Sequence, residues 1–595
     1  MNTLKKIKPK IISVVFLAAS FCLLTTCSGN GSGDANFSIV TDAASEITFT
    51  TAVSGGAVTY NGSGTVGGRG VCWNTKDSPK VTDSKTTDGK GAGTFTSELT
   101  GLKPGTTYYV RAYFYENMTL RYGNQISFKT LDAPAEGAGI ALSLVSDTKA
   151  ITPAIIGLNT QCIKGPYWTE AAFKNAIADI DAGNFRYPGG TIGNFWDWQT
   201  GDYLKGAHQP IGYLNNTPNI YKLDDVKGVY ERSSNRTEPI YMLNVLTSTY
   251  EHQKASLDYA KNMGLPVKNI ELGNEFYLDD PNNSDASARE YMRILPFVKN
   301  YADLCRTWNA NLKRDFPGCK TAIVCVNTPG NWSAARTRVR KWNDSLRYYL
   351  KETDYDAITI HNYTKTGAAA GVAITMYDMV YQSIVSYSRD KIHDASLGTS
   401  KPLWVTEYNF EAGVNPYPGQ WVHGLSALLS SLQLASVPRV EFACFFNLAG
   451  DWKAATIYDR DYPAGSSVQG VKKNNRSATG YSLSILMQAT KNANSIRSID
   501  FATNPTVATT KNGNLKTLYG YLFAGNESKT VLLMNIGGEE QTVNISGLGM
   551  TSPAVEQYRA DKLDTFISPE TFRKETPEIK EGALTLKPYS ITLLK

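Results

Sequence analysis

The sequence has little of the chemistry that marks metal, nucleotide or serine hydrolase sites. Only five His occur among 595 residues, and they form no H-E-x-x-H or comparable ligand pair, so no catalytic metal is expected. No G-x-x-x-x-G-K-[ST] loop and no G-x-S-x-G turn is present. A G-x-G-x-x-G match at 62–67 precedes a strand-like run rather than a helix, which argues against a dinucleotide site. We therefore predict no cofactor.

A strong excess of one charge is also missing. The formal net charge is +6, and four of the positive charges are lysines in the first ten residues, without which the balance would be +2. No long basic run is present, so a nucleic-acid partner is not expected. With 42% hydrophobic and 19% charged residues the chain is typical of globular proteins, and its length predicts several domains. No obligate protein partner is evident.

Cysteines are few and scattered. Beyond the N-terminal segment there are six, and several lie in apolar runs, such as Cys325 in "AIVCV" and Cys444 in "FACFF". This placement favours buried thiols over a disulfide framework. Whether Cys305 and Cys319 pair is left open by the sequence.

Long apolar runs are absent except near the N-terminus. There, four lysines precede "IISVVFLAASFCLLTTC", the pattern of an export signal. The stretch 24–27 resembles a bacterial lipobox, so we predict a lipoprotein signal at 1–27 with lipidation at Cys27 and a flexible tether at 28–35. The resemblance implies an exported protein, lipid-anchored at the outer membrane, cell surface or periplasm. An ordinary cleaved signal peptide is the alternative.

Short strand-like runs separated by turn residues fill 36–131 and predict a β-sandwich. Within it, "LTGLKPGTTYYVRAYFY" (99–115) resembles a fibronectin type III module. "DAPAEGAG" (132–139) is the predicted linker to the next domain.

Between 140 and 496, strand-like runs alternate with amphipathic stretches. This pattern predicts a (β/α)8 TIM barrel, with an open doubly wound sheet as the alternative. The eight predicted strands are 154–160, 184–190, 240–246, 269–276, 321–327, 356–363, 403–409 and 440–447. Strand-like texture returns in 497–595 and predicts a C-terminal β-sandwich, for which 140–150 is a further candidate strand.

Polar side chains stand where several predicted barrel strands end, which in such a barrel is the catalytic face. They are Arg186, Asn274, Glu275, His361, Tyr363 and Glu407. Two carboxyl groups across a cleft, one protonated and one ionised, are the equipment of glycoside hydrolysis. Glu271 shares the strand face of Glu275 and competes for the acid role, although it lies deeper in the strand. Glu411 and Glu441 lack the strand-end placement.

Two motifs carry a family resemblance. "ELGNEFY" and "WVTEYN" look like the strand-four and strand-seven signatures of glycoside hydrolase clan A, whose members are retaining (β/α)8 enzymes. "FRYPGGTIGNFWDW" (185–198) and "ITPAIIGLNT" are similar to segments of its α-L-arabinofuranosidase, heparanase and β-glucuronidase branches. The resemblance covers the barrel and the C-terminal sandwich.

The resemblance implies specific roles. Glu407 is expected to be the nucleophile, Glu275 the general acid/base, and Asn274 the ligand of a sugar 2-hydroxyl. Arg186 and Tyr363 are expected to hold Glu407 ionised and oriented. The family's Trp at the end of strand eight has no clear counterpart, since that run ends in Asn447, and Trp452 is a possible substitute.

Other expectations come from the residues themselves. Desolvation should raise the pKa of Glu275 to suit a proton donor. Trp196, Asp197 and Trp198 could stack on and hydrogen-bond a sugar, although core packing explains at least one tryptophan equally well. His361 is either a structural histidine or a contact of substrate or catalytic carboxylate.

Taken together, the sequence predicts a retaining glycoside hydrolase that acts on a polysaccharide or oligosaccharide. In such an enzyme the carboxyl carbons lie roughly 5–5.5 Å apart. The alternative is a non-catalytic glycan-binding surface protein with a degenerate barrel.

Overall fold

The computed structural model describes most of the chain beyond the N-terminal segment. The described ranges are 37–45, 47, 51–61, 66–116, 118–130, 139–161, 168–204, 220–233, 237–279, 285–328, 333–364, 374–388, 399–410, 417–450, 455–462, 471–510, 512–550 and 552–595. The predicted signal, Cys27, the tether and nearly all of the linker lie outside them. The chain divides into two compact units, the first within 1–43, 54–97 and 109–127 and the second in the rest.

The described residues of the N-terminal region form seven strands in two sheets. Alternating burial along the fifth strand, with Phe95, Ser97 and Leu99 inward, gives these sheets a core face and a solvent face. One sheet has the order β1 (Phe37–Thr41), β2 (Ala52–Tyr60), β5 (Gly93–Leu99), and the other β4 (Ser84–Lys85), β3 (Val66–Asn74), β6 (Thr107–Glu116), β7 (Thr119–Lys129). Two such sheets agree with the predicted β-sandwich, while the fibronectin type III resemblance stays a prediction.

Eight parallel strands close into a barrel, as predicted, so the open-sheet alternative is wrong. Four of them are buried along their whole length and the others at most positions, as expected when helices cover the outside of a parallel sheet. In barrel order they are β9 (Ile156–Asn159), β10 (Asn184–Tyr187), β13 (Glu238–Met242), β14 (Asn269–Glu271), β15 (Lys320–Val324), β16 (Ala357–Thr364), β17 (Leu403–Phe410) and β18 (Val440–Phe446).

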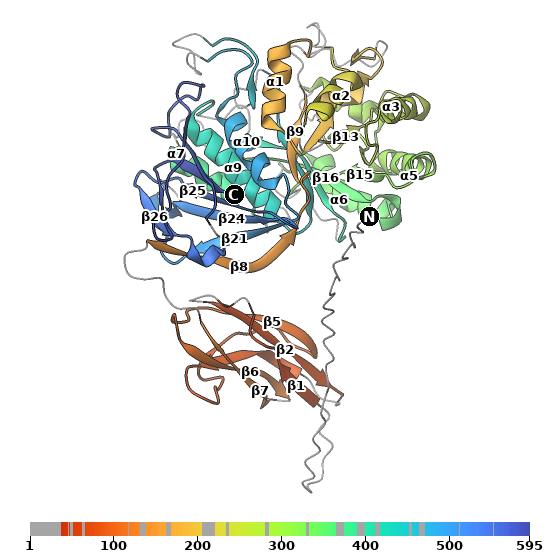
Figure 1. Ribbon diagram of the computed structural model, residues 1–595. Coiled ribbons are helices and arrows are strands. Elements are labelled where there is room, and N and C mark those ends of the chain that lie inside the picture. Colours follow the sequence, from red (N-terminus) through yellow and green to blue (C-terminus); the bar gives the residue numbers. More distant parts are fainter. Residues whose placement is uncertain are drawn as a thin grey trace, which may run out of the picture. The chain divides into compact units, whose positions relative to one another are not determined.

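Helices surround this barrel (Figure 1). They are α1 (Ala171–Ile180), α2 (Leu223–Arg232), α3 (Tyr250–Asn262), α4 (Ala286–Ile294), α5 (Val298–Asp315), α6 (Thr337–Tyr349), α7 (Met376–Val385), α9 (Trp421–Ser436) and α10 (Ala478–Thr490). In α5 the buried positions recur at helical spacing, from Tyr301 through Cys305 and Trp308 to Leu312. Pro296 separates α4 from α5 within a stretch whose pattern is helical throughout. Within the described ranges, no helix is both long and apolar enough to cross a membrane.

Four barrel strands, β10, β13, β14 and β15, end earlier than their apolar runs suggest by three residues or more. The run at 269–276 forms a strand only as far as Glu271, because Gly273 (φ +87°) and Glu275 (φ +50°) leave the extended conformation. Likewise β10 ends at Tyr187, since Gly189 (φ +78°) turns the chain away. Asn274 and Glu275 therefore sit on irregular backbone beyond β14, whereas Arg186 still lies within β10.

A nine-stranded sheet forms the C-terminal part, and β8 is one of its inner strands. In sheet order the strands are β28 (Arg573–Glu575), β27 (Val555–Arg559), β30 (Ser590–Leu594), β25 (Lys529–Asn535), β24 (Leu518–Ala524), β21 (Ser495–Phe501), β8 (Ile140–Ala150), β26 (Gln541–Asn544) and β29 (Ala583–Leu586). Figure 1 shows β8, from before the barrel, beside β21 and β24, from after it. The expectation that 140–150 joins this region is confirmed.

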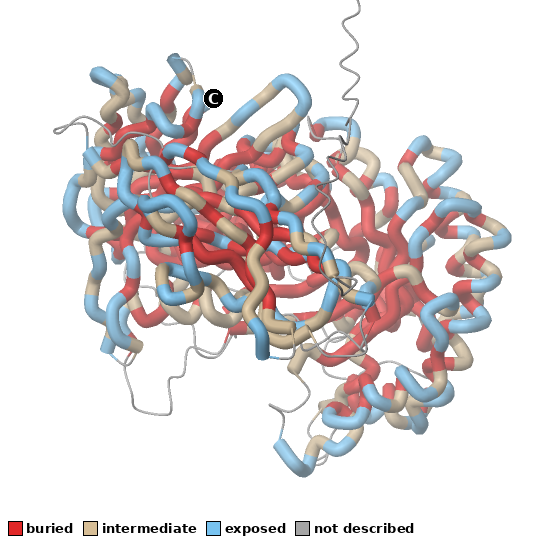
Figure 2. The backbone as a smooth tube through the Cα atoms, turned by 90° about the horizontal axis from the view of Figure 1, so that it is seen from below, coloured by how far each residue is buried: buried red, intermediate tan, exposed pale blue. Residues whose placement is uncertain are grey.

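The two faces of this sheet belong to different cores. Along β25, Val531 and Leu533 pack in the sheet's own cluster, whereas Leu532 and Met534 join the large cluster that includes the barrel and its helices. This period-two alternation attaches the sheet to the barrel. Figure 2 shows buried segments in the interior, enclosed by more exposed ones.

The remaining short elements lie in connections. They are η1 (Thr191–Phe195), β11 (Trp196–Asp197), β12 (Asp202–Tyr203), η3 (Glu352–Asp354), β19 (Ala449–Gly450), β20 (Ile457–Tyr458), β22 (Thr506–Ala508), β23 (Asn514–Lys516) and η4 (Ser546–Leu548). The five described cysteines beyond the signal are buried and free, so Cys305 and Cys319 are not paired. Cys162 lies outside the described residues.

Candidate active site

The six predicted rim residues converge at the carboxyl ends of the barrel strands. Arg186 lies on β10, His361 and Tyr363 on β16, and Glu407 on β17, while Asn274 and Glu275 lie in the loop after β14. Most of these side chains are buried, and that of Glu275 keeps 19% of its surface exposed. The fold thus brings together groups that are up to 221 positions apart in sequence.

Arg186 is the centre of the cluster. Its Nε and Nη2 donate to the two oxygens of Glu271, at 2.5 and 3.0 Å, and its Nη1 donates to Glu407 Oε1 at 2.7 Å. Nη2 also donates to Asn274 Oδ1 at 2.8 Å. Burial opposes the charged guanidinium, but the two carboxylates outweigh it and raise the pKa of Arg186. The Arg186 guanidinium therefore holds the side chains of both Glu407, the candidate nucleophile, and Asn274.

Glu271 is the buried counter-ion of Arg186. Both of its oxygens are bound by the guanidinium, and Thr406 Oγ1 donates a third hydrogen bond at 2.9 Å. Its carboxylate is fully buried. With its oxygens occupied in this way, Glu271 is not available as the general acid, which settles its competition with Glu275.

Glu407 is held on both oxygens. Oε1 accepts from Arg186 and, at 3.4 Å, from Asn159 Nδ2, while Oε2 accepts from the Tyr363 hydroxyl at 2.5 Å. Burial, followed by the charge of Glu407, raises the pKa of Tyr363 well above 10, so this hydroxyl remains a donor. These contacts fix the carboxylate in one orientation. Asn159 is a residue of the site that was not predicted from the sequence.

Glu275 is held on one oxygen only. Its Oε1 accepts from Tyr277 at 3.1 Å and is 2.9 Å from His361 Nδ1. Hydrogen-bond partners among the described residues are found at Oε1 and not at Oε2. Oε2 is therefore the oxygen available to a ligand.

The expected elevation of the Glu275 pKa is wrong for the ligand-free site. Burial does act to raise it, but the hydrogen bond and charge of His361 outweigh burial, so the pKa lies below its ordinary value of 4.5. Sequence reasoning considered desolvation alone. In this state Glu275 is a carboxylate beside His361.

His361 contacts both carboxylates, which answers the question left open by the sequence. Its Nδ1 is 2.9 Å from Glu275 Oε1 and 3.6 Å from Glu407 Oε2. Burial acts to lower the pKa of His361, but the charge of Glu407 and the hydrogen bond to Glu275 raise it above 6.5. The described residues offer its buried Nε2 no hydrogen-bond partner.

Glu275, His361 and Glu407 each place one ligand atom within 4.8 Å of the others. Such spacing suits a metal ion, but the charge balance does not, because the guanidinium of Arg186 already lies 2.7 Å from Glu407. A metal ion here would face a buried cation that cannot be deprotonated. The donor set fits an ion-pair network better than a metal centre.

An aromatic ring closes the cluster at the end of β18. Phe446 is buried, and its ring lies edge-on to Tyr363 with centroids 6.0 Å apart. It stands beside Asn159 in the strand register. The eighth strand thus ends in a Phe, one position before Asn447, where the family has a Trp. Trp452 lies outside the described residues.

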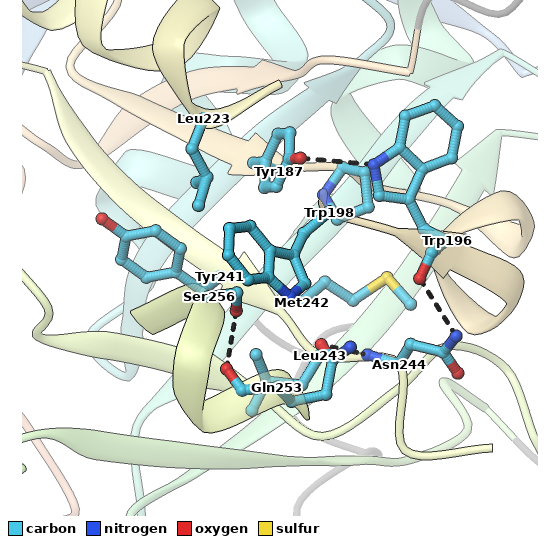
Figure 3. Close-up of a pocket in the computed structure, with 12 residues that line it drawn as sticks. Tyr187, Trp196, Trp198, Leu223, Tyr241, Met242, Leu243, Asn244, Gln253 and Ser256 are labelled. Carbon is cyan, nitrogen blue, oxygen red and sulfur yellow. Dashed lines mark hydrogen bonds between the residues drawn. The ribbon is translucent and has the colours of Figure 1, made fainter. Parts of the chain in front are cut away.

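Trp196, Asp197 and Trp198 are engaged elsewhere. Trp196 donates to the Tyr187 hydroxyl at 3.2 Å, and Trp198 donates to the carbonyl of His252, whose ring is 3.3 Å from Asp197. Both tryptophans line a cavity of about 10 Å³ shown in Figure 3, room for about one water molecule. No described contact joins them to Glu275 or Glu407. Core packing accounts for Trp196, and a sugar contact by Trp198 or Asp197 stays a prediction.

No family model and no curated protein sequence matches this chain. Solved structures of similar fold include the α-L-arabinofuranosidase of Thermotoga maritima in complex with arabinose, with 16% identity, TM-score 0.55 and coverage of 77% of this chain and 99% of that one. A family 51 α-L-arabinofuranosidase from Bifidobacterium longum has 15% identity, TM-score 0.55 and coverage of 78% and 99%. That of Thermotoga petrophila has 16% identity, TM-score 0.52 and coverage of 77% and 99%. At this identity, these likenesses show that the chain shares the fold of these enzymes, a barrel with an attached β-rich region.

Proposed function

We propose that this protein is a retaining glycoside hydrolase of polysaccharides or oligosaccharides, with Glu407 as nucleophile and Glu275 as general acid/base. The observation that carries the proposal is the pair itself. Two glutamates place oxygens within 4.8 Å of each other at the catalytic end of a (β/α)8 barrel, one held on both oxygens and one on a single oxygen. This spacing favours retention, since inverting enzymes separate their carboxyl groups by about 6.5–9.5 Å to admit water.

In the first step Glu407 attacks the anomeric carbon, and the bond from that carbon to the leaving oxygen breaks. Arg186 and Tyr363 hold the attacking carboxylate in place. Glu275 gives its proton to the leaving oxygen. That proton is carried on Oε2, because Oε1 already faces two donors, Tyr277 and His361. A glycosyl ester on Glu407 results.

In the second step Glu275 takes a proton from water, and the oxygen of that water attacks the anomeric carbon and releases Glu407. This step requires the carboxylate form of Glu275, which His361 favours by lowering its pKa. The donors at Oε1 thus support the base role, and protonation of Oε2 supplies the acid role.

The sugar itself is expected to rest on Phe446 and to meet Asn274. The Nδ2 of Asn274 is buried and has no hydrogen-bond partner among the described residues, so a sugar 2-hydroxyl could accept from it. The similarity to arabinofuranosidase structures supports a carbohydrate substrate, and α-L-arabinofuranosides are our first candidates.

A glycan panel tests the proposal. Aryl α-L-arabinofuranosides, β-D-xylosides and β-D-glucuronides, with plant and algal polysaccharides, are incubated with the wild type, Glu407→Ala and Glu275→Ala. We expect hydrolysis with the wild type only, and NMR of the first product should show retained anomeric configuration. If the wild type hydrolyses none of them but binds some, and neither substitution alters binding, the alternative of a non-catalytic glycan-binding protein is correct.

For the location we propose export and lipid anchoring through Cys27, on the strength of the lipobox-like stretch before it. Metabolic labelling with a fatty acid should mark the wild-type chain and not Cys27→Ala. Labelling of neither, with a shortened mature chain, would indicate an ordinary signal peptide instead.

A further inference from the structure

Asn194, in η1, touches neither catalytic glutamate, yet two of its three side-chain hydrogen bonds go to the backbone of Asn274 in the acid/base loop. Its Oδ1 accepts from the backbone N–H of Asn274 at 3.0 Å, and its Nδ2 donates to the carbonyl of Asn274 at 2.8 Å. Nδ2 also donates to the Tyr291 hydroxyl at 3.0 Å. The side-chain amide thus pairs with one residue's backbone as a neighbouring strand would.

The loop needs such a partner because its backbone is not regular. Beyond Glu271 the chain leaves the barrel sheet, and Glu275 adopts φ +50°. A left-handed conformation costs a residue with a Cβ roughly 1–2 kcal/mol and persists only where the surroundings enforce it. Asn194 supplies two hydrogen bonds to the residue immediately before Glu275.

Asn194 is itself fixed and buried. The Thr247 hydroxyl donates to its carbonyl at 3.0 Å, and its side chain has no exposed surface. On the other side of the loop, Arg186 holds the side chain of Asn274. The backbone of Asn274 is therefore held by Asn194 and its side chain by Arg186, which leaves Glu275 little freedom.

We propose that Asn194 is a positioning residue that holds the Asn274–Glu275 backbone so that Oε2 of Glu275 faces the leaving-group oxygen. The inference rests on the proposed function. Without the two hydrogen bonds the backbone can relax away from the left-handed conformation, and a displacement of about 1 Å can cost up to about 100-fold in rate. The loss of rate should affect proton transfer from Glu275 to the leaving group and not the attack by Glu407, because Arg186 and Tyr363 still hold Glu407.

The chain contains a matched control. Asn343 on α6 makes the same pair of hydrogen bonds to the backbone of Val326, which follows β15, at 2.9 and 2.8 Å. It is also buried, and no described contact links it to the two glutamates. Asn194→Ala and Asn343→Ala therefore remove the same pair of backbone hydrogen bonds, one beside the acid/base and one away from it, while Asn194→Ala also removes the bond to Tyr291.

The readout is the dependence of kcat/KM on the leaving group. Phenyl and 2,4-dinitrophenyl α-L-arabinofuranosides are used, or the corresponding pair for whichever sugar the panel selects. A dinitrophenolate leaves without protonation, whereas phenolate departure needs an acid. We expect Asn194→Ala to lose about 10–100-fold with the phenyl glycoside and to stay within about threefold of wild type with the dinitrophenyl one. Asn343→Ala should stay near wild type with both, despite a similar loss of thermal stability.

Equal losses of Asn194→Ala on the two glycosides, or the same pattern in Asn343→Ala, would overturn the positioning role. Should Asn194→Ala fail to fold by circular dichroism, Asn194→Ser is compared in its place and judged by the same ratio. An inactive wild type is a different result, because it contradicts the proposed function itself.

Discussion

At the scale of residues, surroundings distinguish three glutamates that share one chemistry. Glu271 is bound by a guanidinium and a hydroxyl and acts as a counter-ion. Glu407 meets donors on both oxygens, and Glu275 on one oxygen only. In the proposed mechanism, the number and kind of donors, rather than burial alone, therefore decide which carboxylate serves as the nucleophile and which can exchange a proton.

His361 controls the protonation of Glu275. Because its hydrogen bond and charge lower the pKa of Glu275, the acid form is populated only at low pH. In His361→Ala that pKa should rise, so the acid form persists to higher pH. We expect the alkaline limb of the pH profile of kcat/KM to move to higher pH, with a lower maximum rate. Tyr277→Phe removes the other hydrogen-bond donor to Glu275 Oε1 and should move the alkaline limb in the same direction. If the alkaline limb of His361→Ala stayed in place or moved to lower pH, His361 would not lower the pKa of Glu275.

Arg186 stabilises the fold as well as the site. Arg186→Met leaves two buried carboxylates without their cation, which should cost about 3–5 kcal/mol of unfolding free energy at neutral pH. Guanidinium denaturation measures this free energy. Arg293→Met removes an exposed arginine paired with Glu290 and should hardly change the midpoint; equal effects of the two substitutions would refute the argument.

Some site residues could be predicted from the sequence because they follow a recognisable pattern, and others could not because their role depends on contacts that are distant in sequence. The two glutamates, Asn274 and Arg186 stand at or near the ends of apolar runs, so their convergence on one rim was predictable. Asn194 carries no such signal, because its role arises from a contact across 80 positions. The pKa of Glu275 was equally hidden, since it depends on the distance to His361 rather than on its own neighbours in sequence.

At the scale of elements, the eight barrel strands were predictable because buried parallel strands are near-continuous apolar runs. Their ends were less so. The run at 269–276 continues past the strand, since apolar Phe276 is buried against Tyr291 of α4 and Tyr301 of α5. Apolar residues in the sequence predict which positions are buried. They do not predict where hydrogen bonding to the sheet stops, which depends on the backbone conformation.

The loop after β14 requires glycine at position 273. A Cβ there would lie 2.1 Å from Phe276 Cε2, and φ is +87°. Gly264 is a suitable control, because its φ is +90° and no atom lies within 4 Å of the Cβ position. Both alanine variants carry backbone strain, but Gly273→Ala should be less stable than Gly264→Ala by about 1–3 kcal/mol and should also lose activity. Denaturant unfolding and kcat/KM check this; equal stabilities would show that Phe276 can move aside freely.

At the scale of the whole molecule, a segment from before the barrel completes a sheet from after it. Strand β8 lies between β21 and β26, and Leu142 belongs to the core of that sheet. The sequence suggested this pairing only as a candidate, because strand texture does not identify a partner. The nine-stranded order results from contacts between segments separated by the full length of the barrel.

Truncation tests the importance of β8. The two large core clusters draw on residues from Ile140 onward, so a chain that begins at Gly139 should fold and keep its activity. A chain that begins at Ile151 lacks an inner strand of the sheet and should be insoluble or unfold at a clearly lower temperature. Soluble yield, thermal unfolding and kcat/KM distinguish the two. Similar behaviour of both chains would mean that the sheet tolerates the loss.

The central claim is double displacement through Glu407. A 2-deoxy-2-fluoro glycosyl fluoride of the sugar that the panel selects slows the second step, so the glycosyl ester accumulates and can be mapped by peptide mass spectrometry. We predict one sugar per chain on the peptide that contains Glu407, and no label in Glu407→Ala. A label on Glu271 or Glu275, or hydrolysis with inverted configuration and no label, would contradict the account.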